Sequence, residues 1–71
     1  MGKEKKLDYM DRLRQARKEK GVLQKEISDH LGLAKSTYSM YETHQNKMDI
    51  ETFAEVCRFL GVTPNEMLGF E

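Results

Sequence analysis

The feature that most constrains the fold of this chain is a three-residue connection, residues 32–34, between two short helical patterns. Before it, Ile27 and Leu31 form an apolar pair at the i, i+4 spacing of a helix. After it, Tyr38 and Tyr41 stand three residues apart, which places both side chains on one face of a second helix. Because so short a connection permits only a tight corner, the two helices are expected to contact each other closely.

The residues at this corner are of the types that close packing requires. Ser28 follows the first apolar residue and is small enough for the two helix backbones to approach each other there. Gly32 can adopt the positive φ that ends a helix, and Leu33 adds an apolar contact after the turn. Two apolar residues on one side of the second helix leave its other side free. This combination is typical of a helix-turn-helix motif.

Three further helices are predicted around this pair. Asp8 is expected to cap the first helix, which ends at Gly21, and Asp49 to cap the fourth, which ends at Gly61. Residues 63–66, Thr-Pro-Asn-Glu, form a capping box with proline at the first helical position, so a fifth short helix should follow. The buried stripe of the fourth helix is expected to contain Ile50, Phe53, Ala54, Val56, Cys57 and Leu60.

Together these patterns predict an all-α fold: a compact bundle of five short helices, with the helix-turn-helix formed by the second helix (about residues 24–31) and the third (about residues 35–43). Residues 1–7 are polar and are predicted to be a flexible N-terminal segment, followed by one domain at residues 8–71. A chain of this size buries only about 60% of its unfolded surface, so one small core is the limit.

Several classes of protein are disfavoured by what the chain lacks. No apolar run approaches the roughly 20 residues of a membrane span, and the charged first ten residues do not resemble a signal peptide. His30 and His44 have no cysteine or second histidine at ligand spacing, so neither a metal nor another cofactor is expected. The lone Cys57 is interpreted as a small buried hydrophobe, compatible with a cytoplasmic protein. No nucleophile and base can be paired, so we expect neither enzyme activity nor a small-molecule substrate.

The net charge is zero, but the charge is unevenly distributed. Residues 1–25 carry nine Lys/Arg and four Asp/Glu, whereas residues 26–71 carry three Lys/Arg and eight Asp/Glu. One interpretation is a solvated basic N-terminus without a specific role. The other is a dipolar domain with one face turned towards phosphates.

Three segments resemble the phage-repressor type of helix-turn-helix domain, also called the XRE or lambda-repressor-like family. They are LRQARKEKG, LQKEISDHLGLAKSTYSMYE and IETFAEVCRFLGVTPNEML, and the resemblance covers about residues 8–70. It implies a sequence-specific transcriptional regulator that binds double-stranded DNA, and it favours a repressor of phage or mobile-element type. It also implies a homodimer on a palindromic operator, with the third helix in the major groove.

The resemblance assigns roles to individual residues. Gln24 matches the glutamine that bonds a DNA phosphate, Lys35 and Ser36 match the first base-reading positions, and Met40 matches another base-facing position. The complete set of DNA-binding residues implied in this way is Gln24, Lys35, Ser36, Thr37, Ser39, Met40, Thr43, Asn46 and Lys47. In addition, Arg17 and Glu42 match an ion pair that ties the first helix to the end of the reading helix.

The residues alone leave less specific roles open for some of these positions. Ser36 and Thr37 could act only as caps in the first helical turn, and Lys35 could act only to keep the protein soluble. Met67, Leu68 and Phe70 could form a dimer surface or belong to the core of the monomer. The neutral charge also permits an alternative function, a protein-interaction module such as an antitoxin or anti-regulator on the same scaffold.

The chain departs from the family pattern at four positions. Leu23 and Ala34 replace the usual Ser or Thr before the two motif helices, so two side-chain caps should be missing, at ~0.5–2 kcal/mol each. Ser28 replaces an alanine at the corner, where its hydroxyl can bond back to a carbonyl. His44 stands where a glycine commonly ends the reading helix and should adopt a positive φ, which histidine tolerates better than most residues.

Overall fold

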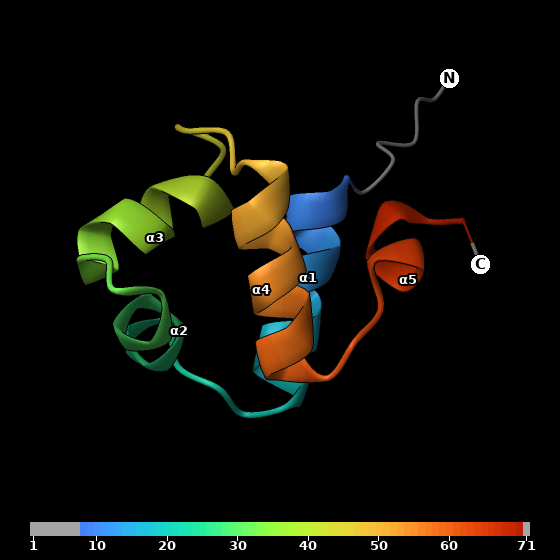
Figure 1. Ribbon diagram of the computed structural model, residues 1–71, viewed down its shortest axis with the longest axis horizontal. Helices are drawn as coiled ribbons and strands as arrows, with labels where there is room; N and C mark the ends of the chain where they lie inside the picture. Colours follow the sequence, from blue (N-terminus) through green and yellow to red (C-terminus); the bar gives the residue numbers. More distant parts are fainter. Residues whose placement is uncertain (1–7, 71) are drawn as a thin grey trace, which may run out of the picture.

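The structure of the protein is a computed structural model that describes residues 8–70, and that part of the chain is entirely helical apart from turns and loops (Figure 1). The helices are α1 (Tyr9–Glu19), α2 (Gln24–Leu31), α3 (Lys35–Glu42), α4 (Ile50–Leu60) and α5 (Pro64–Leu68). The predicted all-α fold of five short helices is therefore confirmed. The flexible segment predicted for residues 1–7 lies outside the described residues.

The helices form two groups on either side of α1 and α4. In Figure 1, α4 crosses in front of α1, the pair α2 and α3 lies on one side of them, and α5 lies on the other. The residues that are completely buried come from all four of the longer helices: Leu13 of α1, Ile27 of α2, Tyr38 of α3 and Val56 of α4. One core thus joins the α2–α3 pair to the rest of the domain.

Local sequence explains where most helices begin. The Asp8 carboxylate accepts hydrogen bonds from the backbone N–H groups of Met10 and Asp11, both at 3.0 Å, and the Asp11 carboxylate accepts one from the Asp8 N–H at 3.2 Å. At α5, the Thr63 hydroxyl and the Glu66 carboxylate form the same reciprocal pair, with both bonds at 3.1 Å. The capping boxes therefore satisfy N–H groups that a helix cannot bond internally.

The buried stripe of α4 contains Phe53, Val56, Cys57 and Leu60 as predicted, but Ile50 was placed there wrongly. Ile50 is the first residue of α4 and is 71% exposed, because it borders an open apolar groove instead of facing the core. Ala54 is only half-buried. In their place the core takes in two methionines that the pattern did not select, Met10 of α1 and Met48 of the loop before α4.

The apolar residues at the end of the chain divide between core and surface. Met67 is buried in the core, whereas Leu68 is 40% exposed and Phe70 is 77% exposed. Of the three residues, Met67 belongs to the core of the monomer and holds α5 there. Leu68 and Phe70 remain at the surface. No helix within residues 8–70 has the length and apolar character needed to cross a membrane.

Candidate nucleic-acid interface

The corner between α2 and α3 has the tight geometry expected from its sequence. Gly32 has φ 73°, and its N–H donates to the Asp29 carbonyl at 3.2 Å. The Leu33 N–H donates to the Ser28 carbonyl at 2.9 Å, which closes the end of α2. Ser28 is fully buried, and its hydroxyl bonds back to the Lys25 carbonyl at 3.0 Å. The small Ser28 side chain is thus enclosed at the corner, as the sequence pattern indicated.

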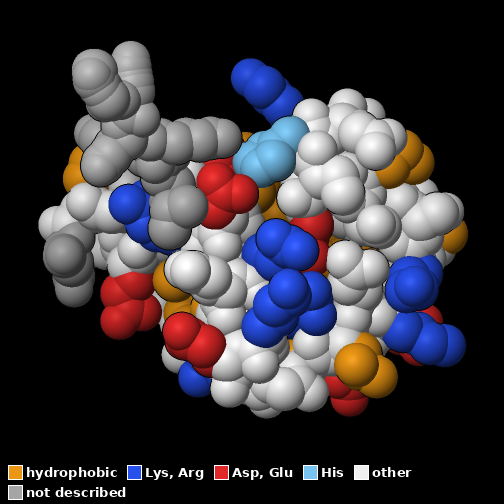
Figure 2. Space-filling model, turned by 180° about the vertical axis from the view of Figure 1, so that it is seen from behind, with side chains coloured by type: hydrophobic (Ala, Val, Ile, Leu, Met, Phe, Trp, Pro, Cys, Tyr) orange, Lys and Arg blue, Asp and Glu red, His pale blue; other side chains and the backbone are white. Residues whose placement is uncertain are grey.

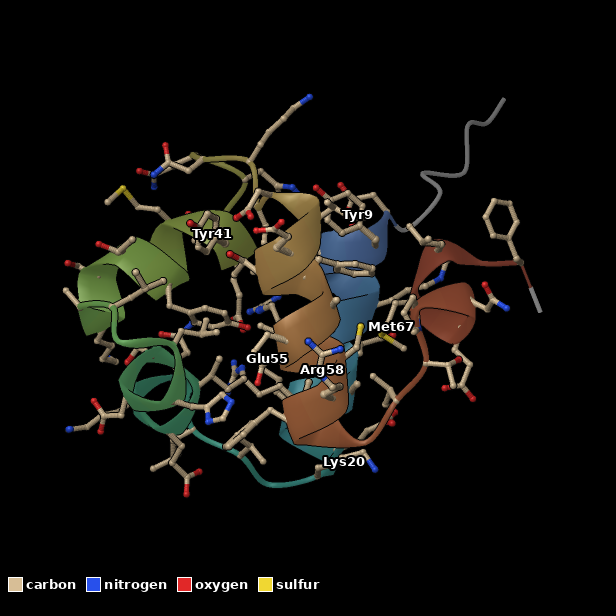
Figure 3. All side chains as sticks on the ribbon, in the orientation of Figure 1. Tyr9, Lys20, Tyr41, Glu55, Arg58 and Met67 are labelled. Carbon is tan, nitrogen blue, oxygen red and sulfur yellow. The ribbon has the colours of Figure 1, made fainter. Side chains whose placement is uncertain are left out.

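Helix α3 has one face in the core and one face in solvent. Tyr38 is completely buried, and Tyr41 is partly buried with its ring edge-on to that of Tyr38, at a centroid separation of 6.2 Å (Figure 3). Lys35 and Ser36, at the start of the helix, are exposed, and Met40 is half-buried. The two tyrosines therefore anchor the helix from behind and leave the side that carries the implied base-reading residues accessible.

The remaining implied DNA-binding residues lie around this exposed side. Thr37 and Ser39 are half-buried within α3, and Lys47 is exposed in the loop that follows. Thr43 and Asn46 are exposed but already bonded to α3: the Thr43 hydroxyl donates to the Met40 carbonyl at 3.4 Å, and the Asn46 amide nitrogen lies 3.7 Å from the Met40 sulfur. Both residues also close the C-terminal end of the reading helix.

The predicted ion pair between Arg17 and Glu42 is present and almost entirely buried. The guanidinium donates from Nε to Glu42 Oε2 at 2.7 Å and from Nη2 to Oε1 at 3.1 Å. Its third nitrogen, Nη1, donates to the Val22 carbonyl at 2.8 Å. The Glu42 side chain is 1% exposed. This pair joins the C-terminal end of α3 to α1 and to the loop before α2.

Gln24 belongs to the same buried network. Its Nε2 donates to Glu42 Oε1 at 2.9 Å, so the residue implied to bond a DNA phosphate is held in place by the end of the reading helix. Burial alone would raise the pKa of Glu42, but the hydrogen bonds from Arg17 and Gln24 outweigh it and lower that pKa below its ordinary value. Glu42 is therefore a carboxylate at neutral pH. Burial, and then the Glu42 charge, raise the pKa of Tyr38.

The two helices of the motif begin without side-chain caps, as expected from Leu23 and Ala34. At α2 the Glu26 carboxylate accepts the Leu23 N–H at 2.8 Å, which is one half of a capping box. The first turn of α3 has no acidic residue. Free N–H groups at a helix N-terminus favour an anion, so the start of α3, which has neither a cap nor an acidic residue, favours one more than the start of α2, where Glu26 already lies.

The loop after α3 is tied back to α1 by a contact that the sequence did not indicate. His44 has the expected positive φ, 66°, and its ring lies between two carboxylates. Nδ1 is 3.4 Å from Asp8 Oδ2, and Nε2 is 3.1 Å from Asp11 Oδ1. A separation of 33 residues between Asp11 and His44 gives no local signal from which the contact could be predicted.

Several basic side chains lie on the face of the molecule that Figure 2 shows. Figure 2 shows the domain from behind, with α1 towards the viewer, and Lys and Arg side chains gather near the middle of this face beside a histidine and acidic groups. Arg14 and Lys18 are exposed residues of α1. Arg14 Nε lies 3.9 Å from Glu42 Oε1, so this half-exposed arginine adjoins the buried network. Sequence reasoning did not select Arg14.

The fold and the corner geometry define a helix-turn-helix domain. Comparison with known proteins agrees, because residues 11–69 match the model of a family described as helix-turn-helix domain. The chain belongs to this family, and the resemblance to its XRE, or phage-repressor, type is confirmed.

The chain is similar to three regulators of Bacillus subtilis (strain 168). It is 37% identical over 62 residues to the HTH-type transcriptional regulator AnsR, covering 87% of this chain and 53% of the relative. It is 31% identical over 60 residues to the SPbeta prophage-derived uncharacterized HTH-type transcriptional regulator YonR, covering 84% and 56%. It is 31% identical over 61 residues to the uncharacterized HTH-type transcriptional regulator YobD, covering 86% and 54%. The chain thus spans about half the length of these curated relatives. No solved structure matches it significantly.

Proposed function

We propose that this protein is a sequence-specific regulator of transcription that binds double-stranded DNA, and more narrowly a repressor of phage or mobile-element type. The observation that carries the proposal is the solvent-exposed side of α3, which presents Lys35 and Ser36 while Tyr38 fixes the opposite side in the core. The names of the relatives support the regulator class, and the prophage origin of YonR supports the narrower proposal.

In the proposed mechanism, helix α3 enters the major groove and the bound protein occludes the promoter. Lys35 suits the O6 and N7 acceptors of guanine, Ser36 can donate to or accept from several bases, and Met40 offers an apolar contact to a thymine methyl. Thr37 and Ser39 assist at a base or a phosphate. Gln24 and the loop residues Thr43, Asn46 and Lys47 bind backbone phosphates and so fix the position of the protein along the DNA. The protein acts by binding, without catalysis, and works in the cytoplasm.

Two substitutions test this division of roles. Lys35→Ala should relax base preference at one operator position by ~1–3 kcal/mol, because only one base loses its partner. Gln24→Ala should weaken binding to all DNA sequences equally, because a phosphate contact does not distinguish one base from another. Selection from a random DNA pool identifies the preferred site, and fluorescence anisotropy on that site and on single-base variants measures both effects. Equal losses from both substitutions on every sequence would contradict the proposal.

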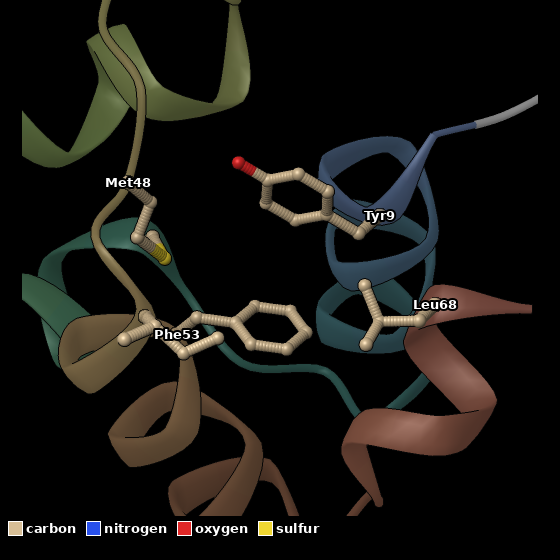
Figure 4. A pocket seen from close by; sticks show the side chains of 5 residues that line it. Tyr9, Met48, Phe53 and Leu68 are labelled. Atoms are coloured by element: carbon tan, nitrogen blue, oxygen red, sulfur yellow. The ribbon is translucent and has the colours of Figure 1, made fainter.

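A homodimer on a palindromic operator is part of the proposal. The surface that supports it is an apolar groove of about 190 Å³ lined by Tyr9, Met48, Ile50, Phe53 and Leu68 (Figure 4). In Figure 4 the Leu68 side chain and the Tyr9 and Phe53 rings face a common space between α1, α4 and α5. The Tyr9 and Phe53 rings meet edge to face at 5.2 Å. A second copy that covers this groove would bury the exposed Ile50 and Leu68.

Sedimentation velocity tests the dimer. Leu68→Ser should weaken self-association, whereas Leu23→Ser, which changes an equally apolar and more exposed leucine at the start of α2, should leave it unchanged. Identical behaviour of the two variants would exclude this groove as the dimer surface.

A protein-interaction module, such as an antitoxin or anti-regulator, is the second candidate. The excess of five acidic over basic residues in residues 26–71 and the same apolar groove favour it. Binding to duplex DNA of mixed sequence at low and at moderate salt separates the two functions. If the folded protein shows no affinity even at low salt, the DNA-binding proposal fails and the interaction module remains.

A further inference from the structure

Two arginines of α1 approach the same carboxylate but differ in what they can still bind. Arg17 commits all three of its guanidinium nitrogens, to both oxygens of Glu42 and to the Val22 carbonyl, and the residue is 8% exposed. It therefore has little capacity to bind a ligand outside the protein. Arg17 is the buried counter-charge of Glu42.

Arg14 lies one helical turn before Arg17 and keeps its capacity for an external ligand. Its side chain is 52% exposed, and Nε is the nitrogen that approaches Glu42, at 3.9 Å from Oε1. The two terminal nitrogens of the guanidinium thus remain for another acceptor. Because Arg17 already neutralises Glu42, the charge of Arg14 is in excess at this position, and the site attracts an anion.

Gln24 reaches the same carboxylate oxygen from the other side of the motif. Its Nε2 donates to Glu42 Oε1 at 2.9 Å, and a primary amide nitrogen has a second N–H for another acceptor. Glu42 Oε1 therefore has a half-buried amide of α2 at 2.9 Å and a half-exposed guanidinium of α1 at 3.9 Å.

We propose that Arg14 binds a DNA backbone phosphate, the same phosphate as Gln24, and that Glu42 holds the two side chains in position for it. The inference rests on the proposed function and adds a contact to it. A guanidinium and an amide side by side suit the several oxygens of a phosphodiester, and arginine can bind two of them at once. The contact reads no base and fixes the position of α1 on the DNA.

Salt dependence of DNA binding tests the contact. We would titrate labelled duplex DNA of mixed sequence with the wild-type protein and with Arg14→Gln, over a range of salt concentrations. Loss of one phosphate contact should lower the slope of log affinity against log salt by about 1. Between roughly 50 and 200 mM salt, the wild type should thus lose about fourfold more affinity than the variant. The base preference selected from a random pool should not change.

The matched control is Arg58→Gln, which removes the same charge from an exposed side chain on α4 (Figure 3). This control should leave the salt slope unchanged, and thermal unfolding verifies that both variants are folded. A slope that changes equally in the two variants, or in neither, overturns the inference.

A double-mutant cycle then tests whether the phosphate is shared. The losses of DNA-binding free energy caused by Arg14→Gln and by Gln24→Ala should not add up in the double variant. The losses caused by Arg14→Gln and by Lys47→Gln should add up. Additive losses in the first pair overturn the shared phosphate. If the wild type binds no duplex at all at low salt, the proposed function itself fails, which is a result distinct from normal binding by Arg14→Gln.

Discussion

The helices of this domain begin in two different ways. Helices α1, α4 and α5 are each closed by a side chain that precedes them, Asp8, Asp49 and Thr63 respectively. Helices α2 and α3 are preceded by Leu23 and Ala34, whose side chains have no acceptor for the N–H groups. The scaffold helices are thus capped by the residue before them, and the two helices of the motif are not.

The pair is held instead by contacts between residues distant in sequence. Glu42 bonds Arg17, 25 positions away, and Gln24, 18 positions away. Its negative charge lies at the C-terminal end of α3, where the helix dipole does not favour it, so the partners must outweigh both the dipole and burial. The motif therefore depends on a buried ionic network, whereas the scaffold helices depend on local caps. Under the proposed function, the uncapped N-termini remain available to phosphates.

The largest effect is expected from Glu42→Ala. This change leaves the Arg17 guanidinium buried without its counter-charge and removes the partner of Gln24, which should cost about 3–5 kcal/mol of unfolding free energy. Urea denaturation followed by circular dichroism measures it. A loss below about 1 kcal/mol, the usual range of an exposed pair, would contradict the claim that this network holds the motif.

Acid should weaken the same network by a smaller amount, because protonation leaves the side chain in place. The folded-state pKa of Glu42 lies below its ordinary value of 4.5, so the stabilisation is complete above that pH and is lost as the pH falls through the folded value. Unfolding free energy measured from neutral pH to well below 4.5 should therefore fall more steeply for the wild type than for Glu42→Gln. Asp49 and Glu55, whose pKa values are also lowered, are common to both proteins and cancel in the difference. Parallel curves would show that Glu42 does not contribute.

Removal of a scaffold cap should have a moderate effect. Thr63→Ala deletes the hydroxyl that accepts the Glu66 N–H and should cost about 1 kcal/mol. Thermal unfolding gives the change, and Thr63→Ser, which keeps the hydroxyl, is the matched control. If the two variants are equally destabilised, the methyl group of Thr63 rather than its cap is what matters.

Addition of a cap to the motif should have the smallest effect and the opposite sign. Ala34→Ser supplies the acceptor that α3 lacks and should raise the unfolding free energy by about 0.5–1 kcal/mol. The same measurement on Ala34→Gly separates capping by the hydroxyl from a backbone effect. No gain from serine would mean that the start of α3 is already satisfied, and the contrast between motif and scaffold would be lost there.

Local chemistry made much of the fold predictable. The cap at Asp8, the capping box at Thr63 and the left-handed Gly32 each depend on a few neighbouring residues, and each lies as the sequence indicates. Spacing also predicted correctly that Tyr38 is buried while Lys35 is exposed, because a rigid helix fixes which side chains share a face. The DNA-binding roles of the implied residues remain predictions.

Features that depend on how the ends of helices meet could not be predicted in this way. Ile50 fits the periodicity of α4 but is exposed, because the pattern does not say how far the neighbouring helices extend along it. Met48 lies in a loop, where no periodicity applies, yet it is buried. The position of Arg14 beside Glu42 could not be predicted either, because no sequence pattern distinguishes Arg14 from the other exposed residues of α1.

The sequence by itself indicated the five helices within residues 8–70, the caps that begin three of them, and which sides of the corner helices are apolar, because these properties arise from chemistry within a few residues. Only the tertiary structure decided that one glutamate gathers Arg14, Arg17 and Gln24 and that His44 joins Asp8 and Asp11. Those contacts exist because packing of the core brings charged and polar side chains of separate helices within 4 Å of one another, and no spacing along the chain encodes that approach.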